Sequence, residues 1–260
     1  MTRRPVIALL TDFGTQDWYV GALRGVLLSR CPQARLLDIS HDIPPQDVLA
    51  GAFTLAAVAP WFPPGTVFLA VVDPGVGSAR ALLAARAHGQ CFIGPDNGLL
   101  TLALARAVRP TIVRLTNRRY WAADLSRTFH GRDVLATVAA AVVSGVPLAR
   151  LGVPLARLTP LEMPIPRRRG RALTGAVIHI DAFGNLITNL PASALAGGRA
   201  AVRYQRRPVR VVSSYTQGNA QELIAVVNSQ GLVELAIREG SAARVFHVKR
   251  GDHVEVRPCS

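Results

Sequence analysis

Lysine, cysteine and carboxylates are scarce in this 260-residue chain, which carries a net charge of +14 at pH 7. Its three cysteines, Cys31, Cys91 and Cys259, form no C-x-x-C pair, which excludes a zinc ribbon and a disulfide framework and favours a cytoplasmic protein. Uninterrupted apolar runs of about 18 residues are also lacking, so we expect no membrane span. The apolar run at 6–10 is too short for the core of a signal peptide and predicts a first strand.

The positive charge could indicate a nucleic-acid-binding protein, because clustered cations displace counterions from phosphates. Nearly all the cations are arginines, however, and the parts 1–160 and 161–260 each carry a net charge of +7. The one dense cluster, Arg167–Arg169 with Arg171, lies beside prolines and is typical of a solvated linker. We therefore expect neither a nucleic-acid nor a membrane partner.

Half of the residues are hydrophobic, which excludes a disordered chain. Up to residue 160, short aliphatic runs alternate with helix-like segments, as in an α/β domain. The expected strands cover 6–13, 35–40, 66–73, 81–87, 90–93 and 111–115, and the expected helices cover 19–27, 48–59, 99–107 and 133–143. Asp47, and Asp96 with Asn97, stand where the N-caps of the second and third helices would lie.

The composition changes at 161–172, a stretch rich in proline and arginine that we expect to link a domain at 1–160 to a second domain at 173–260. The second part contains short strand patterns separated by turn residues. These cover 175–181, 186–189, 200–204, 209–213, 223–228, 232–237 and 252–257. We therefore predict an α/β N-terminal domain followed by a small all-β, barrel-like C-terminal domain.

Three of the 16 carboxylates, Asp12, Asp73 and Asp96, end or closely follow apolar strand runs. The carboxyl ends of strands in an open α/β sheet line the ligand crevice, so these acids indicate a site. The alternative is that each one forms a turn or caps a helix, which aspartate often does after a strand.

Several familiar motifs are absent. Thr11–Gly14 contains a kinase-like D-F-G, but no glycine-rich loop with a strand lysine accompanies it. Gly75-x-Gly77 lacks the third glycine of a dinucleotide fingerprint. The histidines show no metal-ligand spacing and no serine nucleophile elbow occurs, so we expect neither a metal nor a cofactor.

The segment from Asp73 to Arg80 combines an acid at a strand end, a glycine-rich turn and an arginine, which is compatible with a site or with a plain turn. His130 lies between Phe129 and Gly131, ahead of a helix, where it could be catalytic or simply packed.

In the C-terminal part, polar residues interrupt the strand pattern at 180–189 and at Asn228–Gly231. Both breaks could contact a ligand or be hairpin turns. Tyr215 could offer a flat face to a ligand or lie in the core.

Together, seven ordered motifs resemble the S-adenosyl-L-methionine (SAM) hydroxide adenosyltransferases, the adenosine-forming SAM hydrolases related to the fluorinase and chlorinase. The motifs are TDFG at 11–14, HDIPPQD at 41–47, VVDPGVGSAR at 71–80, GPDNGLL at 94–100, TFHGRD at 128–133, IDAFGNLITN at 180–189, and VNSQG with GSAA within 227–243.

The resemblance implies a homotrimer with SAM sites at the subunit interfaces and no cofactor beyond the substrate. It implies that Asp12 holds the ribose hydroxyls, since a carboxylate can accept two hydroxyl hydrogen bonds. Phe183, Asn185 and Tyr215 match the residues that contact the adenine.

Asp181 and Ser229 match residues near the methionine head group. The related halogenases carry an arginine at the position of Gln230 that holds the methionine carboxylate, so this chain departs from them there.

The resemblance also implies that Asp73, Arg80 and His130 hold the water that attacks C5′ of SAM, giving adenosine and L-methionine. Two alternatives are halide transfer and non-catalytic binding of SAM or a nucleoside. Halogenases of the family carry aromatic residues at the positions of Asp73 and His130 and a tryptophan at that of Gln46, and a carboxylate would repel a halide. A non-catalytic binder would not need all three groups.

Overall fold

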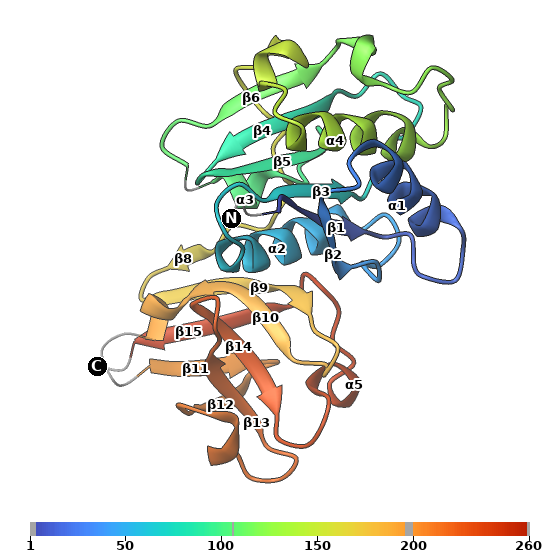
Figure 1. The fold of residues 1–260 in the computed structure, drawn as a ribbon. Coiled ribbons are helices and arrows are strands. Elements are labelled where there is room, and N and C mark those ends of the chain that lie inside the picture. Colours follow the sequence, from blue (N-terminus) through green and yellow to red (C-terminus); the bar gives the residue numbers. More distant parts are fainter. Residues whose placement is uncertain (1–3, 106, 196–199, 259–260) are drawn as a thin grey trace. The chain divides into compact units, whose positions relative to one another are not determined.

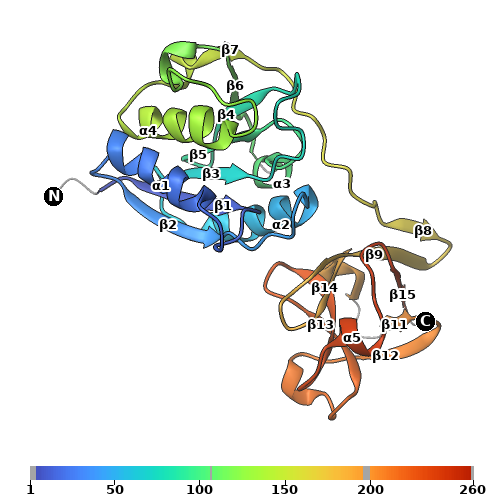
Figure 2. The ribbon, with the colours of Figure 1, turned by 90° about the vertical axis from the view of Figure 1, so that its right-hand side faces the viewer.

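The computed structural model describes residues 4–105, 107–195 and 200–258. The chain forms two compact units, Met1–Glu162 and Met163–Ser260, and each is described by itself (Figures 1 and 2). None of the helices in the described parts is long and apolar enough to cross a membrane.

The first unit contains a seven-stranded sheet with the order β2-β1-β3-β5-β4-β6-β7. Strands β2, β1, β3 and β5 pair in parallel, and β4, β6 and β7 extend the sheet antiparallel. The strands are β1 (Val6–Thr11), β2 (Arg35–Ser40), β3 (Val67–Val71), β4 (Leu82–Ala87), β5 (Gln90–Pro95), β6 (Thr111–Leu115) and β7 (Gly152–Pro154).

Helices cover both faces of this sheet (Figures 1 and 2). Because side chains alternate along a strand, Ile7 and Leu9 of β1 pack with α1 (Tyr19–Arg30) and α4 (Thr137–Val143). Ala8 and Leu10 face the other way and pack with α2 (Val48–Val58) and α3 (Thr101–Leu104). A π-helical turn, Gly131–Ala136, leads into α4. Short 3-10 helices lie at Ala59–Trp61, Arg118–Tyr120 and Leu148–Arg150.

The expected cap of the second helix is confirmed, because Asp47 Oδ1 accepts a hydrogen bond from the Ala50 backbone N–H at 2.9 Å. The expected cap of the third helix is wrong. Helix α3 begins only at Thr101, after Asp96 has accepted a hydrogen bond from the Thr159 N–H and Asn97 has donated one to the Val72 carbonyl. Asn97 Oδ1 also accepts a hydrogen bond from the Leu99 N–H at 3.2 Å, which closes a turn ahead of the helix and does not cap α3.

In the second unit, strands β9 to β15 close into a seven-stranded barrel through the β9–β10 pairing, which confirms the predicted fold class. Every pairing within the ring is antiparallel except β12 with β13. The strands are β9 (Ala172–Ile180), β10 (Leu186–Pro191), β11 (Ala200–Tyr204), β12 (Arg207–Val211), β13 (Leu223–Val227), β14 (Leu232–Ile237) and β15 (His253–Pro258). Short helices lie at Ala192–Leu195, Tyr215–Gln217 and α5 (Ala242–Val245).

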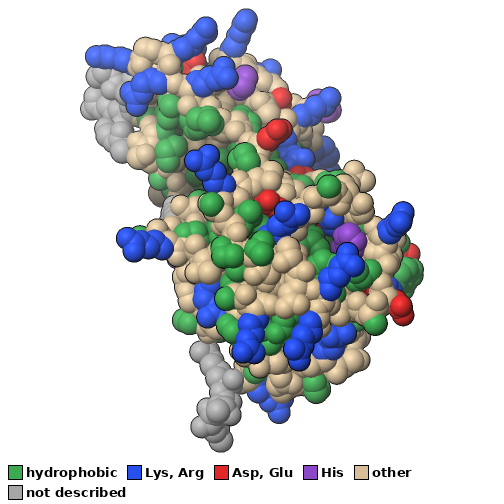
Figure 3. Space-filling view, turned by 90° about the horizontal axis from the view of Figure 1, so that it is seen from above, with side chains coloured by type: hydrophobic (Ala, Val, Ile, Leu, Met, Phe, Trp, Pro, Cys, Tyr) green, Lys and Arg blue, Asp and Glu red, His purple; other side chains and the backbone are tan. Residues whose placement is uncertain are grey.

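The arginine cluster differs from the expected linker. Arg167–Arg169 form strand β8, which pairs antiparallel with the start of β9 and adds an edge outside the closed ring. The three residues are exposed, so they show no alternation that a sequence pattern could detect. On the face drawn in Figure 3, Lys and Arg side chains are scattered among apolar and neutral groups.

The cap at Asp47 provides a test of the fold. We expect Asp47→Ala to destabilise the α/β unit by about 1 kcal/mol, because the Ala50 N–H loses its side-chain acceptor. Urea unfolding followed by circular dichroism measures this change. Asp47→Asn keeps an acceptor oxygen and should stay within a few tenths of a kcal/mol of the parent. Equal loss in both variants would show that the charge, and not the cap, matters.

Candidate active site

Asp73, Arg80 and His130 come together in the first unit. Asp73 lies just after β3, Arg80 just before β4, and His130 directly before the π-helical turn. Arg80 Nε donates to Asp73 Oδ1 at 2.5 Å, and Arg80 Nη2 donates to the second carboxylate oxygen. Both guanidinium Nη atoms lie 3.3 Å from His130 Nδ1. The side chains of Arg80 and Asp73 are only 9% and 6% exposed, so this ion pair is well shielded from solvent.

The position of Arg80 determines the state of the His130 ring. A guanidinium only donates hydrogen bonds, so Nδ1 must accept and the proton of the neutral imidazole lies on Nε2. Burial, together with the positive charge of Arg80, lowers the pKa of His130 below its usual value of 6.5. His130 is therefore neutral at pH 7, with an Nε2–H group available to a ligand.

Asp12 lies at the end of β1, and its carboxylate belongs to the same electrostatic neighbourhood. Its Oδ2 accepts a hydrogen bond from the Gln46 backbone N–H at 2.8 Å, while Gln46 has a positive φ of 66°. Burial raises the pKa of Asp12, and the negative charge of Asp73 raises it further. The third strand-end acid, Asp96, bonds to the Thr159 backbone instead.

A glycine allows the turn between Asp73 and Arg80 to pack closely against another loop. Gly77 has a φ of +85°, and a Cβ built on it would lie 2.8 Å from the carbonyl oxygen of Arg127. Any larger residue would have to move one of two backbone segments. One of these segments carries Arg80, and the other leads to His130.

In the second unit, Asp181, Phe183, Asn185 and Tyr215 line one pocket of about 1130 Å³. The first three lie in the hairpin turn between β9 and β10. The break in the strand pattern at 180–189 is therefore a hairpin turn that also lines a pocket. Asp181 holds this turn, because its Oδ1 accepts hydrogen bonds from the backbone N–H groups of Phe183 and Asn185, and its Oδ2 accepts one from Asn185 Nδ2. Phe183 is 78% exposed, so its ring can stack on a planar ligand.

Tyr215 is fixed by a residue that the sequence analysis did not single out. Its hydroxyl donates to Glu234 Oε1 at 2.7 Å, and Glu234 is only 3% exposed. Burial and the bond to this carboxylate raise the pKa of Tyr215. Glu234 is the single acid in the apolar strand pattern of β14 (Leu232–Ile237), and a lone acid in such a pattern indicates a buried carboxylate with a specific partner.

Ser229 does not line this pocket. It is exposed in the hairpin between β13 and β14, where Asn228 Oδ1 accepts hydrogen bonds from the N–H groups of Gln230 and Leu232. The hairpin interpretation of that segment is therefore supported. Within the described parts of the chain, no group of three or more His, Cys, Asp or Glu side chains could hold a metal ion.

Comparison with known proteins shows to which family the chain belongs. Residues 7–152 match the model of the SAM hydroxide adenosyltransferase N-terminal domain, and residues 175–255 match that of its C-terminal domain. The chain belongs to the SAM hydroxide adenosyltransferase family. The resemblance seen in the sequence motifs is thereby confirmed.

Relatives in this family match the chain over nearly its whole length. An "(R)-S-adenosyl-L-methionine hydrolase" from Salinispora tropica is 40% identical, covering 98% of this chain and 99% of its own. A fluorinase from Actinoplanes sp. is 28% identical, covering 97% of each. A crystal structure of a conserved protein from Thermotoga maritima superposes with a TM-score of 0.89 at 34% identity, covering 96% of this chain and 99% of that one.

The packing at Gly77 gives a test of the site. We expect Gly77→Ala to lower turnover by about 10²-fold, because a displacement of roughly 1 Å in catalytic groups can cost that much. Gly65→Ala is the matched control: Gly65 has a φ of +86°, but its Cβ would meet nothing within 4 Å. Steady-state kinetics of both variants separates the clash from the backbone strain. Equal turnover in the two would contradict the importance of this contact.

Proposed function

We propose that this protein hydrolyses SAM to adenosine and L-methionine by attack of an activated water at C5′. The observation that carries the proposal is the cluster of Asp73, Arg80 and His130 beside Asp12, in a chain that is 40% identical to a SAM hydrolase. Family membership over both domains supports the same activity.

The chemistry of SAM explains why such a cluster suffices. The sulfonium sulfur leaves readily as the neutral thioether of methionine. The reaction therefore needs only a positioned oxygen nucleophile. The oxygen of water forms a bond to C5′ as the C5′–S bond breaks, and the electron pair of that bond goes to sulfur. The products are adenosine, methionine and one proton. Catalysis then consists of orienting the water and favouring its hydroxide-like form.

The hydrogen bonds divide this work between the three residues. Arg80 supplies fixed positive charge, and His130 offers its Nε2–H as a donor to the nucleophile's oxygen. Both oxygens of Asp73 are occupied by Arg80, so the carboxylate acts mainly by holding the guanidinium in place. The geometry thus favours stabilisation of hydroxide over proton abstraction by His130.

We assign substrate binding to the remaining residues. Asp12 would accept hydrogen bonds from the ribose hydroxyls. Phe183 and Tyr215 would stack on the adenine while Asn185 hydrogen-bonds to it, in agreement with their common pocket. The methionine head group would be bound by Asp181 together with Ser229, which lies in the β13–β14 hairpin.

The assembly we propose is a homotrimer with its sites at subunit interfaces, located in the cytoplasm and without a cofactor, a membrane partner or a nucleic-acid partner. The two cysteines in the described parts, Cys31 and Cys91, are both free and buried, in keeping with a reducing compartment.

Incubation of the purified protein with SAM in ¹⁸O-labelled water, with and without chloride, tests the proposal. We expect methionine and adenosine carrying the label at the 5′ oxygen, detected by liquid chromatography and mass spectrometry. Asp73→Asn and His130→Ala should each lower turnover by about 10²- to 10⁴-fold, whereas His88→Asn, at an exposed turn, should not. Chloroadenosine would instead identify a halide transferase, and bound but intact SAM a non-catalytic binder.

The lowered pKa of His130 predicts the pH dependence. Because the neutral imidazole is the form that accepts from Arg80, kcat should be constant at neutral pH and fall as the pH drops through a pKa below 6.5. A kcat–pH profile measures this limb, which should vanish in His130→Gln. A limb of unchanged position in that variant would assign the titration to another group. Protonation of Asp12, whose pKa is raised, should lower kcat/KM for SAM as the pH falls, because the carboxylate then loses its charge.

A further inference from the structure

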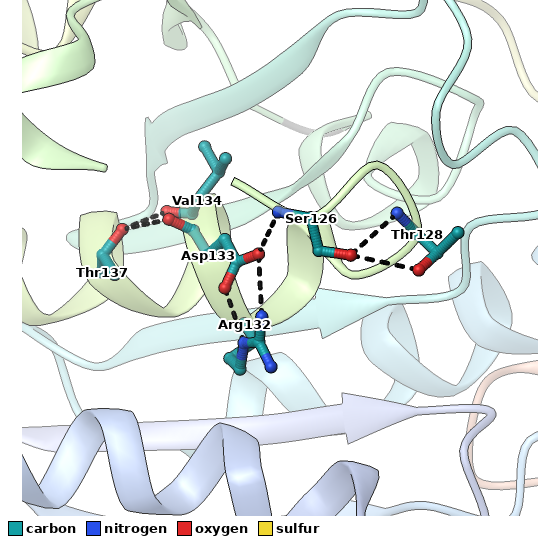
Figure 4. A network of polar contacts seen from close by, with 6 residues as sticks. All are labelled: Ser126, Thr128, Arg132, Asp133, Val134 and Thr137. Atoms are coloured by element: carbon teal, nitrogen blue, oxygen red, sulfur yellow. Dashed lines mark hydrogen bonds and ion pairs between the residues drawn. The ribbon is translucent and has the colours of Figure 1, made fainter. Parts of the chain in front are cut away.

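A buried carboxylate close to the catalytic cluster has no role in the chemistry described above. Asp133 is 3% exposed. Its Oδ1 accepts from Arg132 Nε at 2.6 Å, and its Oδ2 accepts from Arg132 Nη2 at 3.1 Å and from the Ser126 backbone N–H at 2.8 Å (Figure 4). Its backbone carbonyl accepts from the Ala122 N–H. One residue thus holds both ends of the segment 122–126.

Asp133 lies inside the π-helical turn Gly131–Ala136, which starts directly after His130. The Thr137 hydroxyl bonds back to the carbonyls of Asp133 and Val134, at 3.1 and 2.9 Å (Figure 4). Isolated π-helical turns are uncommon and frequently occur at functional sites. Gly131 packs tightly, since a Cβ there would lie 3.2 Å from Val71 at the end of β3.

Two paths lead from the Asp133 carboxylate to the catalytic groups. The first runs through Ser126 to Arg127, whose carbonyl oxygen abuts Gly77 in the turn that carries Arg80. The second runs through Arg132, whose guanidinium lies 5.1 Å from the ring centre of Phe129.

Phe129 is buried and precedes His130 in the chain. Its ring also makes edge contacts with Phe13, Trp18 and Tyr19, so its position is tightly constrained. The Asp133 carboxylate is therefore linked to His130 on one side and to the Arg80 turn on the other.

We propose that Asp133 is a positioning residue for the water-activating cluster: through Ser126 and Arg132 it sets the approach of His130 Nδ1 to Arg80. The inference rests on the proposed hydrolysis of SAM. Both carboxylate oxygens of Asp133 accept hydrogen bonds from Arg132 or Ser126, so its removal should affect kcat and leave KM for SAM nearly unchanged.

Kinetics of two variants tests the proposal. Asp133→Ala should lower kcat by about 10- to 100-fold, while KM stays within about twofold. Asp133→Asn keeps an oxygen for the Ser126 N–H and should recover part of that loss. If Asp133→Ala does not fold, Asp133→Asn must still show a lowered kcat. Wild-type kcat in either folded variant, or a rise in KM that matches the fall in kcat, overturns the proposal.

A control separates positioning from general stability. Gln90 is also a buried polar residue of the first unit, and its Nε2 donates to the carbonyls of Ala59 and Phe62, both at 2.9 Å. Gln90→Ala should lower the melting temperature and leave kcat unchanged. If it lowers kcat as much as Asp133→Ala does, Asp133 contributes stability alone and the proposal fails.

Long-range ¹H–¹⁵N NMR of the histidine rings gives a readout that does not require turnover. The parent should show His130 as the Nε2–H tautomer, and Asp133→Ala should show a mixture of tautomers, because Nδ1 no longer faces Arg80. An unchanged tautomer in Asp133→Ala overturns the positioning role. Absence of SAM turnover in the parent would overturn the proposed function while this measurement still reports on the placement of His130.

Discussion

The proposed active site depends on one guanidinium. Arg80 donates through Nε and Nη2 to both oxygens of Asp73, and its Nη groups reach His130. A lysine could not replace it, because a single ammonium lacks the rigid fork of donors that holds a carboxylate at two points and also reaches an imidazole. A buried ion pair of this kind is costly to desolvate and is most useful where it fixes a geometry. Here it fixes the tautomer of His130 and leaves Nε2–H available to the nucleophile that we propose.

Backbone features bring the three side chains together from distant parts of the chain. Strand β3 ends just before Asp73, and the glycine-rich turn returns the chain within seven residues so that Arg80 can bond back to it. Gly77 lets the loop before His130 close over this turn. The π-helical turn Gly131–Ala136 begins at the residue after His130. The proposed site is therefore built on a close approach at a glycine and on a π-helical turn that precedes α4.

The sequence predicted features that depend on local patterns and missed those that depend on distant partners. Alternation along β1 and the cap at Asp47 involve neighbours within a few residues, and both are present. Asp96 has the same local pattern as Asp47, but its partner, Thr159, is 63 residues away. The exposed strand at Arg167–Arg169 lacks an apolar face, and its pairing with β9 alone defines it. The contacts of Asp73, Arg80 and His130 were expected only from the family resemblance, since no spacing rule relates residues 50 positions apart.

The charges of the site also favour water over a halide as nucleophile. Asp12 and Asp73 carry two negative charges against one positive charge on Arg80, while His130 is neutral at pH 7. The net negative charge of these groups attracts a sulfonium cation. A halide would have to enter as an anion past the carboxylates, whereas water enters neutral and gains negative charge only beside Arg80 and the sulfonium. A fluorinase matches this chain over 97% of its length at 28% identity, and in the site that we propose the carboxylate of Asp73 would favour an oxygen nucleophile over a halide.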